Sequence, residues 1–382
     1  MKKQMYRLQD LIKNFDSKRI PLSSREREQR RGIYPYYGAT SILDYVNDYL
    51  FDGSYILLGE DGTVVNNDGS PVLQLVNGKF WVNNHAHVLQ NTELVDFYYL
   101  YYLLKNLNIK SIVTGAVQQK ISQSNLNSYE VEIFEDKYYQ KKCASILSSI
   151  DEKIIINNAM NNNLEQEAMC LFNHYFPYKI NDNLPEGWRI GTFDEIIELH
   201  DSKRIPLSGQ DRNQMQNKIY PYYGATSLMD YVDNYIFDGI YLLLGEDGTV
   251  IDDYGMPILQ YVWGKFWVNN HAHIITGKRG YSVESLYLLL KQTPIKSIVT
   301  GAVQAKISQT NLKALNVIIP PENLITEFNV KIEKLFSLIR NNKDENEKLI
   351  QLRDTLLPKL MSGEIDVSNV DISTDKLSFS EK

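Results

Sequence analysis

The chain lacks most features that mark secreted, membrane or nucleotide-driven proteins. Among its 382 residues only Cys143 and Cys170 are cysteines, which excludes a disulfide framework and is typical of a reduced, cytoplasmic protein. No apolar run reaches membrane-spanning length, and the opening MKKQMYRLQDLIKNF lacks the apolar segment of a signal peptide. A phosphate-binding GxxxxGK[ST] loop, a glycine-rich dinucleotide loop and an Asn-Pro-Pro-Tyr-type methyltransfer motif are also missing. These absences exclude a standard nucleotide motor and predict a cytoplasmic location.

Excess positive charge is lacking as well. The net charge is −7, which argues against a protein that coats nucleic acid indiscriminately. Part of the acidity lies in residues 364–382, which we expect to form a weakly ordered tail. Near the N-terminus the balance is reversed, because three acids face seven basic residues: Lys13, Lys18, Arg19, Arg25, Arg27, Arg30 and Arg31. A local basic patch for an anionic partner is therefore compatible with the acidic total.

The sequence does contain a long internal repeat. FWVNNHAH occurs at 80–87 and again at 266–273, and DSKRIPLS, IYPYYGATS, LLGEDGTV and IKSIVTGAVQ also occur twice in the same order. The copies are 185 residues apart at DSKRIPLS (16 and 201) and 186 apart at FWVNNHAH, because the second copy has one extra residue in the intervening loop. The chain is therefore two copies of one domain.

Two further stretches have the pattern of paired helices. Residues 138–175 contain neither proline nor glycine, and Leu147 and Ile150 each begin a series spaced seven residues apart. A second pair of series begins at Phe328 and Ile332. This spacing is typical of a coiled-coil seam, and the asparagines in the middle of both seams would set register. We expect two helices, each about 50 Å long, that pair antiparallel.

Within each repeat the pattern is mixed α/β. LLGEDGTVV indicates two short strands around an Asp-Gly turn, KFWVNNHAHVL alternates as a strand does, and ELVDFYYLYYLLKNL is typical of a buried helix. We expect domain 1 at 1–137, the first helix at 138–176, domain 2 at 177–323, the second helix at 324–363 and the tail at 364–382. The antiparallel helices would relate the two domains by a pseudo-twofold axis.

The duplicated His-x-His allows several interpretations. On a strand, both rings would lie on one face and, with a carboxylate, could bind zinc, although the spacing fits no recognised zinc pattern. A core or turn role for one histidine is the plainer interpretation. The third is polar contact with a ligand, since asparagine and histidine suit base edges and phosphates.

Other motifs have competing interpretations too. GEDG is either a catalytic acid pair or, as we favour, a tight turn. The triplet Glu135-Asp136-Lys137 resembles a nuclease motif, but the second repeat has IIPPENL there, so we attribute it to chance. TGAVQ followed by KIS predicts an exposed loop whose glutamine suits adenine and whose lysine suits phosphate or guanine, against the alternative of a solvated hairpin.

Taken in order, these motifs resemble a known family. SKRIPLS, YPYYGATS, LLLGEDGTV, TGAVQxKIS, IIPPENLITEF and RDTLLPKLMSGEI, arranged around two long helices, are similar to the specificity subunit of type I restriction–modification systems. The resemblance covers nearly the whole chain except the tail. The first copy departs from it by lacking LPEGWRIGTFDEI and by having EIFEDKYYQ in place of VIIPPENLI.

The resemblance implies a function without catalysis in this chain. Each domain would be a target recognition domain that reads half of a split double-stranded DNA site, and the helices would act as spacers. Two modification subunits would supply S-adenosylmethionine and adenine methylation, and restriction subunits would supply ATP-driven, Mg-dependent translocation and cleavage. No metal or cofactor is expected in this chain. The alternatives are a metal-dependent hydrolase or nuclease with duplicated His-Asn sites, and a protein-binding scaffold.

Two further expectations concern the target. Half-sites would lie about one helical turn, near 34 Å, apart, and because the two domains are so alike the target would be nearly palindromic. Two differences between the copies would break this symmetry: Gln119 against Ala305, and Asn77 against Trp263. The candidate DNA-contacting residues, in which the Lys-Arg pairs are expected to bind phosphate, are Lys18, Arg19, Tyr36, Thr40, Ser41, Gly62, Thr63, Asn83, Asn84, His85, His87, Thr114, Gly115, Gln118, Gln119 and Lys120 in the first copy, and Lys203, Arg204, Tyr222, Thr226, Ser227, Gly248, Thr249, Asn269, Asn270, His271, His273, Thr300, Gly301, Gln304 and Lys306 in the second.

Overall fold

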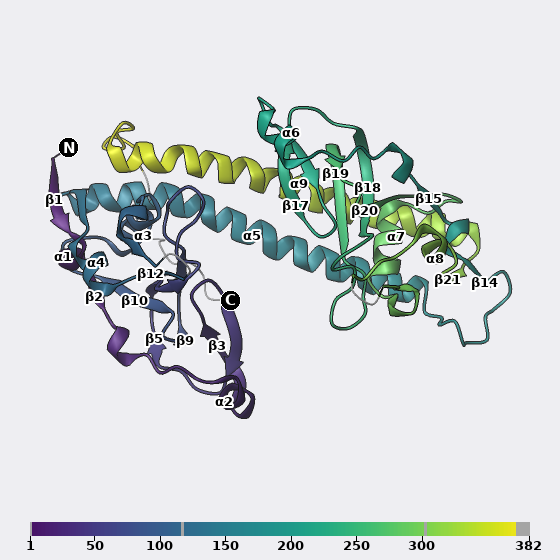
Figure 1. Ribbon diagram of the computed structural model, residues 1–382, viewed down its shortest axis with the longest axis horizontal. Helices are drawn as coiled ribbons and strands as arrows, with labels where there is room; N and C mark the ends of the chain where they lie inside the picture. The colour runs from purple at the N-terminus through teal and green to yellow at the C-terminus, as the bar shows by residue number, and fades with distance from the viewer. Residues whose placement is uncertain (1, 116–117, 302–303, 372–382) are drawn as a thin grey trace. The chain divides into compact units, whose positions relative to one another are not determined.

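The chain divides into two units, each built around one sequence repeat (Figure 1). The computed structural model describes residues 2–115, 118–301 and 304–371. Unit 1 comprises Met1–Ile156 and Glu345–Lys382, and unit 2 comprises Asn157–Asp344. Two long helices, α5 (Lys137–Tyr175) and α9 (Glu322–Ser362), each contribute one part to unit 1 and one part to unit 2.

The described residues of unit 1 form four small sheets, with the strand orders β1-β13, β2-β10-β6-β8, β11-β12-β7 and β4-β3-β9-β5. All pairings are antiparallel except β3 with β9. The elements are β1 (Lys3–Arg7), α1 (Leu8–Leu11), β2 (Ile12–Asn14), η1 (Asp16–Lys18), α2 (Ser24–Gln29), β3 (Arg31–Tyr37), β4 (Ile42–Val46), β5 (Phe51–Asp52), β6 (Tyr55–Gly59), β7 (Asp61–Gly62), β8 (Leu73–Val76), β9 (Lys79–Val82), β10 (Ala86–Asn91), α3 (Phe97–Lys105), η2 (Lys110–Ile112), β11 (Val113–Thr114), β12 (Gln119–Ile121), α4 (Gln123–Ser128) and β13 (Glu130–Phe134).

Unit 2 repeats this arrangement with longer strands. Its sheets have the orders β14-β21 and β15-β20-β18-β19-β16-β17, and again one pairing, β16 with β19, is parallel. The elements are β14 (Arg189–Thr192), η3 (Phe193–Glu195), β15 (Ile197–Leu199), η4 (Asp201–Lys203), α6 (Gly209–Gln214), β16 (Tyr220–Tyr223), β17 (Leu228–Val232), β18 (Phe237–Gly245), β19 (Leu259–Val268), β20 (Ala272–Gly277), α7 (Val283–Leu290), η5 (Lys296–Ile298), α8 (Gln309–Lys313) and β21 (Asn316–Ile319).

A local sequence difference explains the longer strands of unit 2. In β18 and β19 the residues Ile240 and Trp263 lie opposite each other, and β-branched and aromatic side chains favour extended backbone. Unit 1 has Ser54 and Asn77 at these positions, where its strands are interrupted. The mixed α/β class expected from the sequence is therefore confirmed in both repeats, although the first forms several short sheets and the second forms one six-stranded and one two-stranded sheet.

The apolar residues form separate cores under each repeat. In unit 1, α3 buries Tyr99, Leu100, Leu103 and Leu104, as the FYYLYYLL pattern predicts. Its N-terminus is capped by Asp96, whose carboxylate accepts hydrogen bonds from the backbone of Tyr98 and Tyr99. In unit 2, α7 has the same place and buries Leu286 and Leu290 in that unit's core.

The long helices pair antiparallel within each unit. In unit 1, Asp151 of α5 bonds to Arg353 of α9 at 2.8 Å. In unit 2, Phe172 of α5 contacts Phe328 of α9 with ring centroids 5.7 Å apart, and Asn342 donates to the Asn161 side chain at 2.9 Å. Every residue of the expected seven-residue seams is buried or half-buried. The coiled coil is therefore confirmed, and both helices begin and end within two residues of the expected positions.

The start of the acidic tail corrects an expectation. Val367 is 1% exposed and belongs to the unit 1 core, and Lys142 of α5 donates to the carbonyl of Ser368 at 2.7 Å. Two apolar side chains, Ile365 and Val367, anchor this segment despite the charge around them. Residues 365–368 are thus anchored on unit 1 rather than weakly ordered, while 372–382 lie outside the described residues.

Candidate nucleic-acid interface

Four loops of unit 1 meet along one edge of the domain. The backbone N–H of Glu60 donates to His85 at 2.8 Å, and that of Ile121 donates to Glu60 at 2.8 Å. β7 pairs with β12, which places Gln119 opposite Gly62. The side chain of Gln74 donates to the carbonyl of Gly38 at 3.0 Å and holds the fourth loop. We call the exposed part of this edge the polar edge; in unit 1 it consists of Thr40, Ser41, Gly62, Thr63, Asn84, His85, Thr114, Gly115, Gln118, Gln119 and Lys120.

Unit 2 forms the same edge with equivalent bonds. Glu246 donates from its backbone to His271, and Ile307 to Glu246, both at 2.8 Å. The Gln260 side chain donates to Gly224 at 2.9 Å. The polar edge of unit 2 consists of Thr226, Ser227, Gly248, Thr249, Asn270, His271, Thr300, Gly301, Gln304, Ala305 and Lys306. Gly248 and Ala305 are half-buried, and the other nine are exposed.

The TGAVQ turn depends on its glycine. Gly115 has φ +87° and Gly301 has φ +95°, a region that favours glycine. A Cβ atom on either would lie 2.0 Å from the carbonyl oxygen three residues later, Gln118 or Gln304. The turn therefore brings Thr114 and Lys120 together, and the Thr114 hydroxyl donates to the Lys120 carbonyl at 3.2 Å. Residues 116–117 and 302–303 lie outside the described residues.

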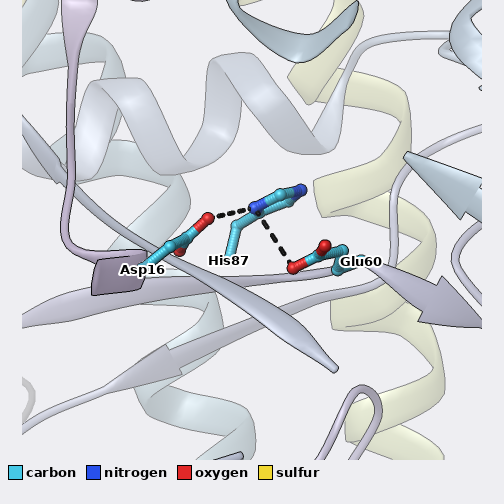
Figure 2. Close-up of side chains that lie close together, drawn as sticks. All are labelled: Asp16, Glu60 and His87. Carbon is cyan, nitrogen blue, oxygen red and sulfur yellow. Dashed lines mark hydrogen bonds and ion pairs between the residues drawn. The ribbon is translucent and has the colours of Figure 1, made fainter. Parts of the chain in front are cut away.

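A cluster of charged side chains lies beneath each polar edge. Figure 2 shows three members of the unit 1 cluster, Asp16, Glu60 and His87. The His87 ring donates from Nδ1 to Asp16 at 2.6 Å and faces the Ile121 carbonyl with Nε2 at 2.9 Å. Nδ1 also lies 3.7 Å from Glu60. Because both ring nitrogens face acceptors, the doubly protonated imidazolium satisfies this geometry. His273 repeats it with Asp201 at 2.6 Å and Ile307 at 2.8 Å.

Arginine completes the cluster. The Arg19 guanidinium donates to Glu60 at 2.6 Å and to the Ala86 carbonyl at 2.7 Å, while Lys120 lies 3.3 Å from the same carboxylate. Burial raises the pKa of Asp16, but the hydrogen bond and charge of His87, with the Val88 N–H, outweigh it and leave that pKa below its ordinary value. The pKa of Asp201 is lowered by the same balance.

The same three side chains have the composition of a metal-ligand set. The ligand atoms of Asp16, Glu60 and His87 lie within 4.8 Å of one another, as do those of Asp201, Glu246 and His273. The guanidinium of Arg19 or Arg204, however, bonds the glutamate at 2.6 Å and lies 3.5 Å from the aspartate. Both histidine nitrogens are also engaged. The carboxylates are therefore balanced by protein cations, and we interpret the cluster as a brace beneath the loops.

Several candidate contact residues have internal positions instead. Tyr36 is 1% exposed, and its hydroxyl accepts from the Leu22 N–H and donates to the Leu22 carbonyl. Asn83 and His87 are 5% and 1% exposed. Tyr222, Asn269 and His273 are buried in the same way. The Arg19 and Arg204 side chains are only 12% and 13% exposed and are held by the internal bonds described above. These eight expected DNA contacts are corrected to structural roles, because residue type alone does not reveal which way a side chain points.

The two histidines of each His-x-His do not share a face. His87 lies within β10, but His85 precedes that strand, in the turn at Asn84, so the alternation of a strand does not apply to it. The His85 side chain is 47% exposed and its Nδ1 bonds the carboxylate of Asp61. His271 is also 47% exposed and bonds Asp247 at 2.6 Å.

This Asp–His pairing was missed in the sequence, where GEDG indicated only a turn. The available signal was the joint repetition of GEDG and HAH in both copies.

The remaining sequence candidates are of two kinds, exposed lysines and a tryptophan that contacts a long helix. Lys18 and Lys203 are exposed next to the clusters and stay candidates for phosphate contact. Trp263 contacts α9 instead, donating from its indole N–H to Asp344 at 2.9 Å, so its difference from Asn77 concerns helix packing rather than reading.

The nuclease-like triplet does not converge on a site. Glu135 pairs with Lys2 at 2.9 Å, Asp136 accepts from the Tyr138 backbone at the start of α5, and Lys137 lies 4.0 Å from Glu93. Interpreting this triplet as chance therefore agrees with its geometry.

Fold and site together define a class: two like α/β domains in tandem, each with the same polar edge and each packed on a pair of long helices. The family model described as "Type I restriction modification DNA specificity domain" matches residues 2–166 and again residues 185–353. The chain therefore belongs to the type I restriction–modification specificity family. Each match includes one polar edge and part of one long helix, α5 in the first match and α9 in the second.

Individual relatives support the assignment. The chain is 32% identical over 161 residues to a putative type I restriction enzyme specificity subunit from Haemophilus influenzae, a match that covers 42% of this chain and 40% of that protein. It is 24% identical over 309 residues to the MjaIX specificity subunit from Methanocaldococcus jannaschii, covering 71% and 70%. The crystal structure of the type I S subunit from M. genitalium matches with a TM-score of 0.61 at 17% identity, covering 94% of this chain and 96% of that one. Among the described residues, no helix is both long and apolar enough to cross a membrane.

Proposed function

We propose that this chain is the DNA sequence-recognition subunit of a type I restriction–modification complex. Each unit reads one half of a bipartite double-stranded target through its polar edge. The observation that carries the proposal is that one set of exposed amide, hydroxyl, imidazole and ammonium groups is built twice by the same backbone contacts. Such groups hydrogen-bond to base edges and to phosphates, and a bound helix of DNA requires both kinds of contact.

The target is proposed to be nearly palindromic. The described residues of the two polar edges are identical at ten of eleven positions, the exception being Gln119 against Ala305. Edges with the same groups on the same backbone have the same base preferences. If α5 and α9 present the edges through a pseudo-twofold axis, the two half-sites are inverted copies, with centres about 34 Å or a multiple of it apart.

Catalysis is assigned to the partners. The buried clusters are balanced ion pairs, and the described side chains of the nuclease-like triplet have separate partners. We propose that two modification subunits dock on the paired helices and bring S-adenosylmethionine for adenine methylation. Restriction subunits with ATP and Mg join the same complex, and no cofactor is bound by this chain.

The test is to coexpress this chain with a type I modification subunit in cells without other methyltransferases and to map N6-methyladenine across the genome. We expect one bipartite motif whose halves are inverted copies differing at one or two positions. Two unrelated half-sites would contradict the near-palindrome while leaving the recognition role intact. Methylation that does not depend on this chain would contradict the recognition role itself.

A further inference from the structure

We propose that Asp61–His85 and Asp247–His271 are proton-dependent DNA-contact dyads, in which the aspartate orients the ring and the exposed Nε2–H donates to an acceptor on DNA. This inference rests on the proposed function and specifies which atom of the polar edge makes the contact. It also predicts that pH regulates DNA affinity, because the strength of the contact depends on whether the ring carries a second proton.

The geometry singles out Nε2. In unit 2, Nδ1 of His271 bonds the Asp247 carboxylate at 2.6 Å, and His85 bonds Asp61 in the same way in unit 1. The aspartate side chains are 18% and 22% exposed, whereas the rings are 47% exposed. Because a carboxylate only accepts hydrogen bonds, Nδ1 must carry a hydrogen. The other nitrogen of a ring fixed in this way is left for a ligand.

The turn around the ring is held by hydrogen bonds. The backbone N–H of His85 donates to the Asn83 side chain at 2.8 Å, and its carbonyl accepts from Glu60. His271 makes the same bonds with Asn269 and Glu246. The buried asparagine of NNHAH therefore fixes the turn from below while the aspartate fixes the ring from the side. A contact held in this way needs little reordering when a ligand binds.

The charged surroundings identify the chemistry of the ligand. Around His85 are the carboxylates of Asp61 and Glu60, with Lys120 at 3.3 Å and Arg19 at 2.6 Å from Glu60. Arg19 also donates to the Asn84 carbonyl, one residue from the ring. Asp16 lies 3.5 Å from the same guanidinium and is paired with the His87 imidazolium at 2.6 Å. With the His85 ring protonated, four cations therefore face three carboxylates and the edge has a net positive charge. An acceptor of negative character fits it, either a phosphate oxygen or the O6 and N7 atoms of guanine.

Proton uptake and DNA binding are then coupled. The neutral ring offers only a lone pair at Nε2, which meets an acceptor unfavourably, whereas the imidazolium donates a charge-assisted hydrogen bond. DNA affinity should therefore rise as pH falls from about 8 to about 6. The buried pair His87 and His273, which donates to Asp16 and Asp201, also contains imidazole, so the test must separate the two kinds of histidine.

The experiment measures DNA affinity against pH for the complex of this chain with its modification subunits. Fluorescence anisotropy on the mapped target and on a random duplex is recorded at pH 6, 7 and 8 at constant ionic strength. The variants are His85→Gln with His271→Gln, Asp61→Asn with Asp247→Asn, and His174→Gln as the matched control. His174 is an exposed histidine near the end of α5 and has no place on the polar edge.

For the wild type and His174→Gln we expect affinity for the target to rise about fivefold per dyad as pH falls from 8 to 6. The double glutamine variant should keep its melting temperature and lose this rise, and the double asparagine variant should reduce it. A methylphosphonate at the contacted phosphate removes the rise if phosphate is the acceptor, and 7-deazaguanine removes it if guanine N7 is.

The inference is overturned if the double glutamine variant keeps the pH dependence of affinity. It is also overturned if the His174→Gln control loses that pH dependence. In both cases the target is still bound in preference to random DNA, so the proposed function survives. Loss of that preference at every pH in the wild type overturns the proposed function together with the inference.

Discussion

The guanidinium of Arg19 and the carboxylate of Glu60 lie 2.6 Å apart beneath the polar edge of unit 1, and Arg204 and Glu246 repeat that distance in unit 2. Each arginine also donates to two backbone carbonyls of the NNHAH turn, so one side chain joins the 3₁₀ turn at DSK to the loop that presents the exposed histidine. The internal role of this arginine changes what its replacement should do.

Replacing Arg19 or Arg204 with glutamine should reduce the free energy of unfolding by about 2–3 kcal/mol, because a largely buried carboxylate loses its charged hydrogen bond and keeps only a lysine at 3.3 or 3.5 Å. Calorimetry of the wild type and of each single variant should show a lower melting temperature for the unit, 1 or 2, that carries the substitution. Lys18→Gln is the matched control, since that neighbouring cation is exposed. Equal melting temperatures for Arg19→Gln and Lys18→Gln would contradict the bracing role.

Lys18→Gln together with Lys203→Gln should weaken DNA binding by a similar factor on target and random duplexes, because phosphate contacts are independent of sequence. The slope of log affinity against log salt concentration should become shallower by about 2, one counterion-release step for each lost contact. Titrations at four salt concentrations measure the slope. An unchanged slope would place both lysines away from the phosphates.

Acid should destabilise the domains through Asp16 and Asp201. Their pKa values are lowered in the folded state, despite burial, by hydrogen bonds and charge from His87 and His273. A carboxyl with a lowered folded pKa contributes stability above its unfolded value near 3.8, and loses it as pH falls through the lower folded pKa. The free energy of unfolding of the wild type should therefore decrease below about pH 4.

Asp16→Asn and Asp201→Asn variants test that assignment. Each should be less stable than the wild type at pH 7, and the difference should shrink as the pH is lowered. Denaturant unfolding at pH 7, 5 and 3 measures both quantities. A difference that stays constant across this range would mean that neither carboxyl gains stability from its charge.

Gln119→Ala should make the described residues of the two polar edges chemically identical. One position of the half-site read by unit 1 should then change to match the half-site of unit 2, since a specific amide contact discriminates by about 1–3 kcal/mol. The methylation motif of this variant, compared with that of the reciprocal Ala305→Gln, measures the effect. A variant at Asn77, which is equivalent to the helix-contacting Trp263, is the control and should keep the motif.

The sequence predicted the long helices well, but it did not predict which site residues are exposed. The seven-residue spacing of the series that begin at Leu147 and Phe328 predicted both long helices and their pairing, because a periodic apolar seam has to be buried along its whole length. The antiparallel direction was predicted from the connectivity of the chain. The repeat predicted that Asp16 has the same position in unit 1 as Asp201 in unit 2, and that His87 corresponds to His273 in the same way. It did not indicate which of the repeated polar residues faced outward.

The histidines show why. Strand alternation predicted that His85 and His87 would share a face, but β10 begins between them at Ala86, so a turn places one ring at the surface and the following strand buries the other. Boundaries of this kind depend on contacts from elsewhere in the chain, here Asp61 and Asp16. The same holds for Trp263, whose indole N–H donates to Asp344 of α9, far away in the sequence.

The sequence by itself determined the duplication, the mixed α/β domains, the helix pair and the family resemblance, since each depends on periodicity or on residue order along the chain. Only the tertiary structure decided that Arg19 and His87 brace the edge while Lys18 and His85 are exposed on it. The physical reason is that the direction of a polar side chain depends on which distant groups offer it a hydrogen bond or an opposite charge, and only the folded chain brings those groups within reach.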